Sequence, residues 1–197
     1  MRGKIFLTVP KLIARILQLG RTFFYKLVSN NEVKGTPNRH QPIQCMGLGE
    51  VLMGGTVNIG FPQSPFFFSG YCYLEARNVS ALIEIGENTW INNNFCAIAE
   101  HQKIVIGERC FIGINVEIYD SDFHGQKIHE RYISTCVRAK SVSIGSDVFV
   151  GSNCKILKGV TIGSGAIIAA GSVVVRDIEP MTIAGGNPAV FIKKIDF

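Results

Sequence analysis

The sequence predicts an all-β protein whose core is a parallel β-helix, and a repeat of six residues is the first reason. From residue 144 onward an aliphatic side chain recurs at every sixth position: Ile144, Val150, Ile156, Ile162, Ile168 and Val174. Most of these are followed, four residues later, by a small or β-branched residue. Such a period predicts a short strand in each hexad, with the aliphatic side chain turned toward a common axis.

A second marker sets the length of one coil. An isoleucine followed by glycine, with another aliphatic residue two places before it, recurs with the isoleucine at five positions: Ile59, Ile85, Ile106, Ile144 and Ile162. The last step is 18 residues, or three hexads, so one triangular coil takes 18 residues. We expect the glycine to occupy a turn that needs an unusual φ. The repeat predicts about five to six coils.

Longer steps between the markers locate insertions. The steps before residue 106 exceed one coil by eight and then by three residues, and the step from Ile106 to Ile144 exceeds it by 20. Because Ile112 and Ile118 keep the six-residue period, the largest insertion starts after Ile118. The segment 119–140 is therefore predicted to be a loop on a rigid scaffold, where functional residues are often placed.

An amphipathic basic helix is predicted within residues 1–33, and Pro10 suits its first turn. Polar side chains step by three or four residues along one side: Lys11, Arg15, Gln18, Thr22 and Lys26. Charges interrupt the apolar residues too often for a membrane span or a signal peptide. Two interpretations stay open: a helix packed on its own domain or on a sister subunit, or peripheral membrane association through residues 1–30.

The composition is that of a globular chain, with 47% apolar and 18% charged residues. The formal charge of +5 favours an anionic partner. Nucleic acid is not expected as that partner, because aromatic residues do not alternate with basic ones and no known motif is present. The six cysteines form no CxxC pair, so we expect buried, reduced thiols of a cytoplasmic protein rather than a zinc knuckle.

The hexads, the long loop and the closing "IAGGNPAVFIKKI" together resemble the left-handed β-helix, or hexapeptide-repeat, acyltransferases. Within that family the chain is similar to the maltose and galactoside O-acetyltransferases and to the sugar O-acetyltransferases of surface-polysaccharide synthesis. The resemblance runs from about residue 48 to 195. It implies a left-handed coil, acetyl-CoA as donor, a sugar as acceptor and a homotrimer with active sites between subunits. Residues 43–180 would form the acyltransferase domain and 181–197 a C-terminal extension.

The same resemblance assigns roles to individual residues. His124 falls where the family has a loop histidine that faces an adjacent subunit. The acceptor side is assigned to Asn92, Asn94 and Glu100, and Asp122 of the loop is placed with them. The donor side is assigned to Phe149, Ser152, Ala170, Arg176 and either Lys193 or Lys194. The excess positive charge would then meet the phosphates of coenzyme A.

Acetyl transfer to a sugar hydroxyl needs a base that takes the hydroxyl proton during attack. A histidine, with an unperturbed pKa of about 6.5, is neutral and ready for this at cytoplasmic pH. We therefore expect His124 to be the general base of a direct attack, without an acyl-enzyme, and backbone N–H groups to stabilise the oxyanion. Either Asp120 or Asp122 would orient the other ring nitrogen.

Three alternatives to sugar O-acetylation remain. N-acetylation of an amino sugar needs the same base. The second alternative is a metal enzyme like the γ-class carbonic anhydrases, in which three histidines hold the metal and two of them are five residues apart, as are His124 and His129. The third histidine of those enzymes lies a full coil and more upstream, whereas His101 is only 23 residues before His124. A β-helix scaffold without activity would need neither the histidine loop nor the basic C-terminus. No metal is expected.

Overall fold

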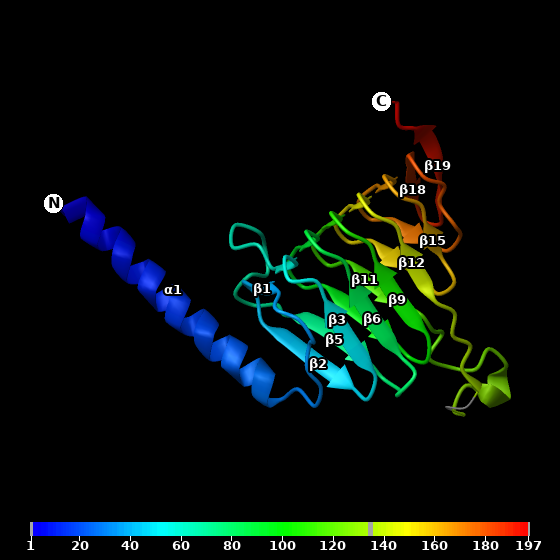
Figure 1. Cartoon of the computed structure of the whole chain (residues 1–197), viewed down its shortest axis with the longest axis horizontal. Helices are drawn as coiled ribbons and strands as arrows, with labels where there is room; N and C mark the ends of the chain where they lie inside the picture. Colours follow the sequence, from blue (N-terminus) through cyan, green and yellow to red (C-terminus); the bar gives the residue numbers. More distant parts are fainter. Residues whose placement is uncertain (1, 134–135, 197) are drawn as a thin grey trace.

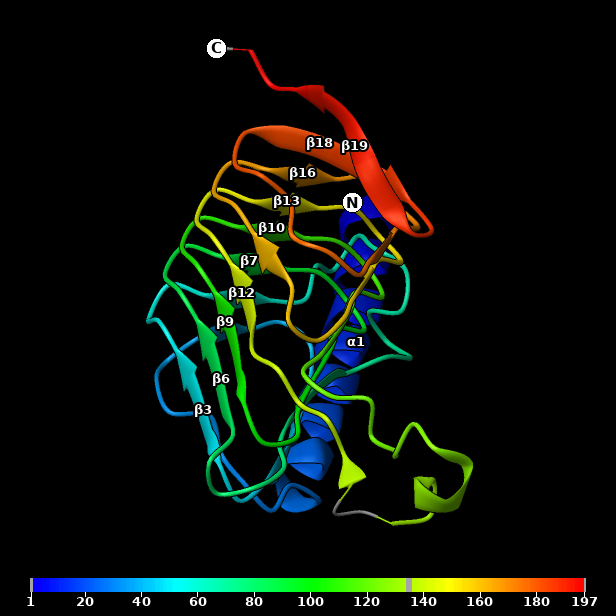
Figure 2. The ribbon, with the colours of Figure 1, turned by 90° about the vertical axis from the view of Figure 1, so that its right-hand side faces the viewer.

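The computed structural model describes residues 2–133 and 136–196, with side chains from residue 12 onward. This part of the chain forms a long N-terminal helix, α1 (Arg2–Leu27), and a tapering stack of short strands wound as a left-handed parallel β-helix (Figure 1). The predicted fold class is confirmed. Seen from the side, the strands form three flat faces around one axis (Figure 2).

The three faces are the three sheets, and each is named here by its strands. Face A holds β3 (Glu50–Met53), β6 (Leu82–Ile85), β9 (Lys103–Ile106), β12 (Val142–Ile144) and β15 (Thr161–Ile162). Face B holds β1 (Asn38–Arg39), β4 (Asn58–Ile59), β7 (Trp90–Ile91), β10 (Phe111–Ile112), β13 (Phe149–Val150), β16 (Ile167–Ile168), β18 (Thr182–Gly186) and β19 (Ala189–Lys194). Face C holds β2 (Ile43–Gly47), β5 (Cys72–Ala76), β8 (Cys96–Ala99), β11 (Glu117–Tyr119), β14 (Lys155–Ile156) and β17 (Val173–Val174).

The core is a column of aliphatic side chains, one from each hexad. On face A, Ile85, Ile106 and Ile144 pair in register although 21 and 38 residues separate them. All three are at most 1% exposed. Each fully buried isoleucine contributes about 1.5–3 kcal/mol relative to an exposed one, so the register that stacks them is strongly favoured. The inserted residues lie outside the stack, as the coil arithmetic predicts.

One marker was assigned to the wrong face. Ile59 lies on face B and pairs with Ile91, whereas Ile85 pairs with Met53 on face A. The step from Ile59 to Ile91 is 32 residues, so the early insertion is 14 residues rather than eight. The Ile-Gly pair at 59 therefore occurs one hexad later in the coil than the other four. Sequence periodicity alone does not distinguish one face from the next, because all three repeat every six residues.

The marker glycines permit close contact between coils. Of the five, Gly60 alone has a positive φ. A Cβ on Gly107 would lie 2.7 Å from the carbonyl carbon of Gly145 in the next coil, closer than real Cβ atoms come. The left-handed conformation falls instead two residues later, at Asn88, Arg109 and Asp147. The expected unusual φ is thus wrong for four marker glycines, and steric space is the reason for glycine there.

The predicted loop 119–140 is found between β11, which ends at Tyr119, and β12, which starts at Val142. It carries a short 3-10 helix, Ile128–Glu130, and leaves the edge between faces C and A (Figure 1). Its two ends are tied together: the Lys140 N–H donates to the Asp120 carbonyl at 2.7 Å, and Ser121 bridges Ala139. The loop thus leaves the scaffold at a fixed point.

The sequence predicts Pro10 in the first turn of the N-terminal helix. The helix begins at Arg2 instead, so Pro10 lies inside it. The helix contacts the first coils through its polar side. Gln18 donates to the His40 carbonyl at 2.9 Å, and the ring of Tyr25 stacks on that of Tyr71 with centroids 4.4 Å apart. Within the described chain, no helix has the length and apolar character to cross a membrane.

Candidate functional site

A cavity of about 380 Å³ opens on the outer side of face B. Its floor is a column of aromatic side chains, Trp90, Phe111 and Phe149, which occupy equivalent positions on β7, β10 and β13. Alternate residues of a strand face opposite sides, so the aliphatic residue after each aromatic enters the core and the aromatic itself points outward. Their exposed fractions are 40%, 57% and 47%. Large aromatic side chains exposed in a column give this hollow a mostly apolar lining.

Three predicted site residues meet in this cavity: Asn92, Phe149 and Ser152. Sequence reasoning missed Trp90 and Phe111, although each stands directly before a core aliphatic residue, as Phe149 does. It also missed Asn93, which is buried and holds the cavity rim. The Asn93 side chain accepts from the Phe61 N–H at 2.9 Å and donates to the Pro65 carbonyl at 2.8 Å.

His124 lies exposed on the loop, and a backbone carbonyl orients it. Its Nδ1 is 3.1 Å from the carbonyl oxygen of Arg131. A carbonyl can only accept, so Nδ1 must carry the proton that it donates, and Nε2 of the neutral ring is then an unprotonated acceptor. The loop therefore presents the histidine in the tautomer that can take a proton at Nε2.

Neither carboxylate expected to orient His124 does so. The buried Asp120 carboxylate accepts three backbone N–H groups, from Glu100 at 2.7 Å, His101 at 3.1 Å and Gln102 at 2.8 Å. The Asp122 carboxylate accepts from Lys158 at 2.6 Å and from Gln126 at 3.1 Å. Asp120 thus fixes the turn that precedes β9, and Asp122 ties the loop to the coil of Lys158.

The residue before the histidine is held in an unfavourable backbone conformation. Phe123 has a φ of 60°, which costs an L-residue about 1–2 kcal/mol. Its ring packs edge-on against Tyr119, with centroids 5.5 Å apart, and the Arg77 guanidinium lies 5.1 Å from the ring centroid. These contacts offset the strain and fix the direction in which His124 leaves the loop.

Two residues assigned to the acceptor side are engaged within the scaffold. Glu100 is 8% exposed, and its carboxylate pairs with Arg77. Asn94 belongs to a column of asparagines with positive φ at the edge between faces B and C. It donates to Asn115 at 2.7 Å, and Asn115 donates to Asn153 at 3.1 Å. Asn94 lines a separate cavity of about 630 Å³ on face C.

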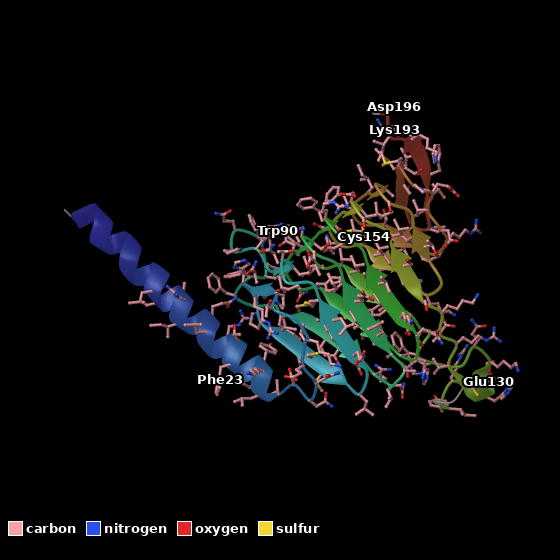
Figure 3. The ribbon with its side chains drawn as sticks, viewed as in Figure 1. Phe23, Trp90, Glu130, Cys154, Lys193 and Asp196 are labelled. Carbon is pink, nitrogen blue, oxygen red and sulfur yellow. The ribbon has the colours of Figure 1, made fainter. Side chains whose placement is uncertain are left out.

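Phe149, assigned to the donor side, is part of the aromatic column, and Ser152 and Ala170 lie on successive coils at the corner that follows face B. The Gly171 N–H donates to the Ser152 carbonyl at 2.8 Å, which stacks Ala170 and Ser152 at the same corner. Arg176 lines a smaller cavity, of about 260 Å³, beside the hairpin β18–β19. Lys193 lies on that hairpin near the C-terminus (Figure 3). Lys194, the other basic residue considered, donates to the Pro180 carbonyl at 3.4 Å.

The remaining histidines show no metal-ligand arrangement. His129 is exposed beside Glu130, with Nε2 and Oε1 3.8 Å apart. Within residues 2–133 and 136–196, no group of three or more His, Cys, Asp and Glu side chains is arranged to hold a metal ion. The metal alternative therefore gains no support from this geometry.

The loop and the aromatic cavity lie on different sides of one chain. The loop leaves the edge between faces C and A, and the cavity opens on face B, which is opposite that edge in a three-sided prism. In Figure 3, Trp90 of the cavity and Glu130 of the loop stand on opposite sides of the coil stack. His124 therefore does not reach the cavity of its own chain.

Comparison with known proteins identifies the family to which this β-helical chain belongs. The family described as bacterial transferase hexapeptide (six repeats) matches residues 141–176, and the hexapeptide repeat of succinyl-transferase matches residues 103–121. A Saccharomyces cerevisiae protein named as an acetyltransferase is 43% identical over 145 residues, which are 73% of this chain and 67% of that protein. The chain belongs to the hexapeptide-repeat acyltransferase family.

Solved structures agree with this placement. The polySia specific acetyltransferase NeuO is 28% identical, with a TM-score of 0.54, over 85% of this chain and 69% of its own. A maltose O-acetyltransferase from Clostridium difficile 630 is 26% identical, with a TM-score of 0.56, over 95% of this chain and 84% of its own. The chain spans 56% to 67% of the length of the first curated relatives that it matches.

Proposed function

We propose that this protein transfers an acetyl group from acetyl-CoA to a hydroxyl of a sugar, a unit or precursor of a surface polysaccharide. The observation that carries the proposal is the oriented loop histidine, with Nδ1–H on the Arg131 carbonyl and Nε2 left to accept a proton. Two similar solved proteins, NeuO and the maltose enzyme, are named as acetyltransferases of carbohydrates. Both lines of support favour the same chemistry.

In the proposed reaction the sugar hydroxyl gives its proton to Nε2 of His124 as its oxygen attacks the thioester carbonyl carbon. The carbonyl π electrons move to oxygen, and backbone N–H groups at a coil corner stabilise this oxyanion. When the intermediate collapses, the C–S bond breaks, and the imidazolium returns the proton to the coenzyme A sulfur. The products are an acetyl ester and free coenzyme A, and no acyl-enzyme forms.

The site is proposed to be shared between copies, because His124 and the aromatic cavity lie on opposite sides of one chain. A second copy placed with its face B under the loop would bring Nε2 toward Asn92. We propose a homotrimer, in which every loop covers the cavity of the next subunit and three equivalent sites form. The large polar cavity on face C, lined by Tyr73 and Tyr119 among others, would then be covered by the neighbouring face B.

The aromatic column is the proposed seat of the pantetheine arm. A thin, mostly apolar chain suits the surface of Phe149, and backbone groups of Ser152 and Ala170 would bond to its amides. Arg176, at the edge between faces C and A, and Lys193, on the hairpin β18–β19, are the proposed partners of the phosphates. On the acceptor side, Asn92 and Asp122 are the proposed contacts, because Asn92 lines the aromatic cavity and Asp122 lies two residues before His124 on the loop, whereas Asn94 lines the separate cavity on face C.

The test is calorimetric titration of the purified protein with acetyl-CoA, followed by transfer assays on a panel of sugars. We expect one donor site per chain, weakened by Arg176→Ala. His124→Ala should keep donor binding but lose roughly 10²–10⁴ in kcat, the contribution of a placed general base. Full transfer activity in His124→Ala would disprove its role, and no donor binding would disprove the function.

The product test also separates O- from N-acetylation, which need the same base. An acetyl ester is cleaved by mild alkali, whereas an acetamide survives it. With acetyl-CoA labelled in its acetyl group, a product that keeps the label after alkali would identify the amino group of an amino sugar, rather than a sugar hydroxyl, as the acceptor. We propose a cytoplasmic location, where acetyl-CoA is made.

A further inference from the structure

The apolar side of α1 faces away from the protein. Eight large apolar side chains of the helix are each between 52% and 67% exposed: Leu12, Ile13, Ile16, Leu17, Leu19, Phe23, Phe24 and Leu27. Figure 1 shows the helix running out from the first coils, with its N-terminal half beyond them. An uncovered apolar surface of this size is unusual on a soluble domain and marks an interaction site.

The contacts with the coils come from the opposite side of the helix. Gln18, Arg21 and Tyr25 are three and four residues apart and so share one side of the helix. Gln18 donates to the His40 carbonyl, and Arg21 donates to the carbonyls of Phe67 and Gly70. The ring of Tyr25 stacks on that of Tyr71. A stripe of apolar residues, Leu12, Ile16, Leu19, Phe23 and Leu27, follows the same spacing about half a turn away. The helix is therefore attached to its own domain by its polar side, and its apolar side is left uncovered.

The positive charge of the chain is concentrated in this helix. Residues 2–27 contain six of the 20 lysines and arginines and none of the 15 acidic residues. The rest of the chain holds 14 basic and 15 acidic residues, so it is close to neutral. Coenzyme A phosphates, proposed to bind Arg176 and Lys193, therefore do not account for the basic balance.

We infer that α1 docks the protein on the surface of an anionic lipid bilayer. A helix that lies in the interfacial plane needs an apolar side in the acyl region, basic residues at the headgroups and its polar side toward water. Arg15 and Lys26 lie beside the apolar stripe on a helical wheel, and the β-helix is attached on the water side. All three requirements are met at once.

Charge complementarity favours the bilayer over a second copy of the chain. Two such helices packed by their apolar sides would bring Arg15 and Lys26 of one near those of the other, with no acidic residue in either helix to offset them. The rest of another copy, with 14 basic and 15 acidic residues, carries almost no net negative charge to match them. Anionic headgroups attract each basic residue near the surface by about 1 kcal/mol, or about fivefold in affinity. This inference does not depend on the proposed acetyl transfer.

The test is flotation of the full chain with vesicles of phosphatidylglycerol and phosphatidylcholine in equal parts, against pure phosphatidylcholine. We expect binding to the anionic vesicles, weakened roughly 30-fold when Arg15 and Lys26 are both changed to Gln. Phe23→Glu should weaken it roughly 10- to 100-fold, the value of burying one large apolar side chain. The matched control is Val79→Glu, at a 78% exposed position outside the helix, which should bind like the parent.

Two further measurements keep the inference falsifiable. The thermal midpoint of Phe23→Glu should equal that of the parent, because the side chain is 64% exposed. Its molar mass by light scattering should also be unchanged. Equal binding to both kinds of vesicle, or vesicle binding unaffected by Phe23→Glu, would overturn the inference. A fall in molar mass in Phe23→Glu would also overturn it and assign the apolar stripe to a contact between copies.

Discussion

Replacing Asp120 by Asn separates a structural carboxylate from a catalytic one. The side chain is fully buried, and its two oxygens accept three backbone N–H groups from residues 100–102. An amide of the same size has one acceptor oxygen, so its NH₂ group must face at least one N–H donor. The substitution thus removes a hydrogen bond and weakens the others without changing the volume of the core.

The magnitude follows from the hydrogen bonds. A bond to a charged acceptor contributes about 1.5–3 kcal/mol, and the bonds that remain lose the assistance of the charge. We expect Asp120→Asn to cost about 2–4 kcal/mol, which for a chain of this size lowers Tm by about 4–16 °C. The backbone carbonyl of Asp120 also holds the loop that carries His124. We therefore expect Asp120→Asn to lower kcat as well.

Asp122→Asn is the matched control. Its carboxylate pairs with Lys158 in a partly buried position, with side chains 29% and 20% exposed, and the amide oxygen of Asn can still accept from Lys158, so the cost should stay at about 1 kcal/mol. The assay is thermal unfolding of both variants beside the parent, with transfer rates measured below the lower Tm. If Asp120→Asn kept the parent Tm but lost kcat, the carboxylate would be orienting His124 and the structural assignment would be refuted.

Three further predictions test the loop, the coil stacking and the thiols. Phe123→Ala removes the ring that fixes the strained backbone before His124. We therefore expect kcat to fall by roughly 10²-fold, with the affinity for acetyl-CoA unchanged in calorimetry. An unchanged kcat would contradict this. Gly107→Ala places a methyl group against the backbone of the next coil and should lower the free energy of unfolding by about 1–3 kcal/mol. Gly20→Ala is the control, because the space around Gly20 is open, and it should not lower the free energy of unfolding. Burial raises the pKa of Cys96 to about 11, so its thiolate forms only as the pH approaches that value. Iodoacetamide at pH 8 should therefore label Cys136, which lies on the loop, before Cys96; earlier labelling of Cys96 in mass spectra would disagree.

The sequence by itself determined the coil and the place of its largest loop. Its six-residue period is a local property, since each hexad contributes one strand and one core side chain wherever it stands in the stack. The predicted loop 119–140 therefore agrees with the observed strand ends at Tyr119 and Val142 to within two residues. The resemblance to the family, rather than the period, selected Asn92 for the acceptor side and Phe149 and Ser152 for the donor side, and the structure brings all three to one cavity.

Contacts between coils were decided only by the tertiary structure. Whether Ile59 belongs to face A or B, and whether Asp120 meets His124 or the backbone of residues 100–102, depends on which segments the insertions bring together. Orientation of His124 by the Arg131 carbonyl left no trace in the sequence, because any residue supplies a backbone carbonyl. The direction of α1 is also a tertiary property: the amphipathic pattern predicts an apolar side, and only its attachment through Gln18 and Arg21 shows that this side faces outward.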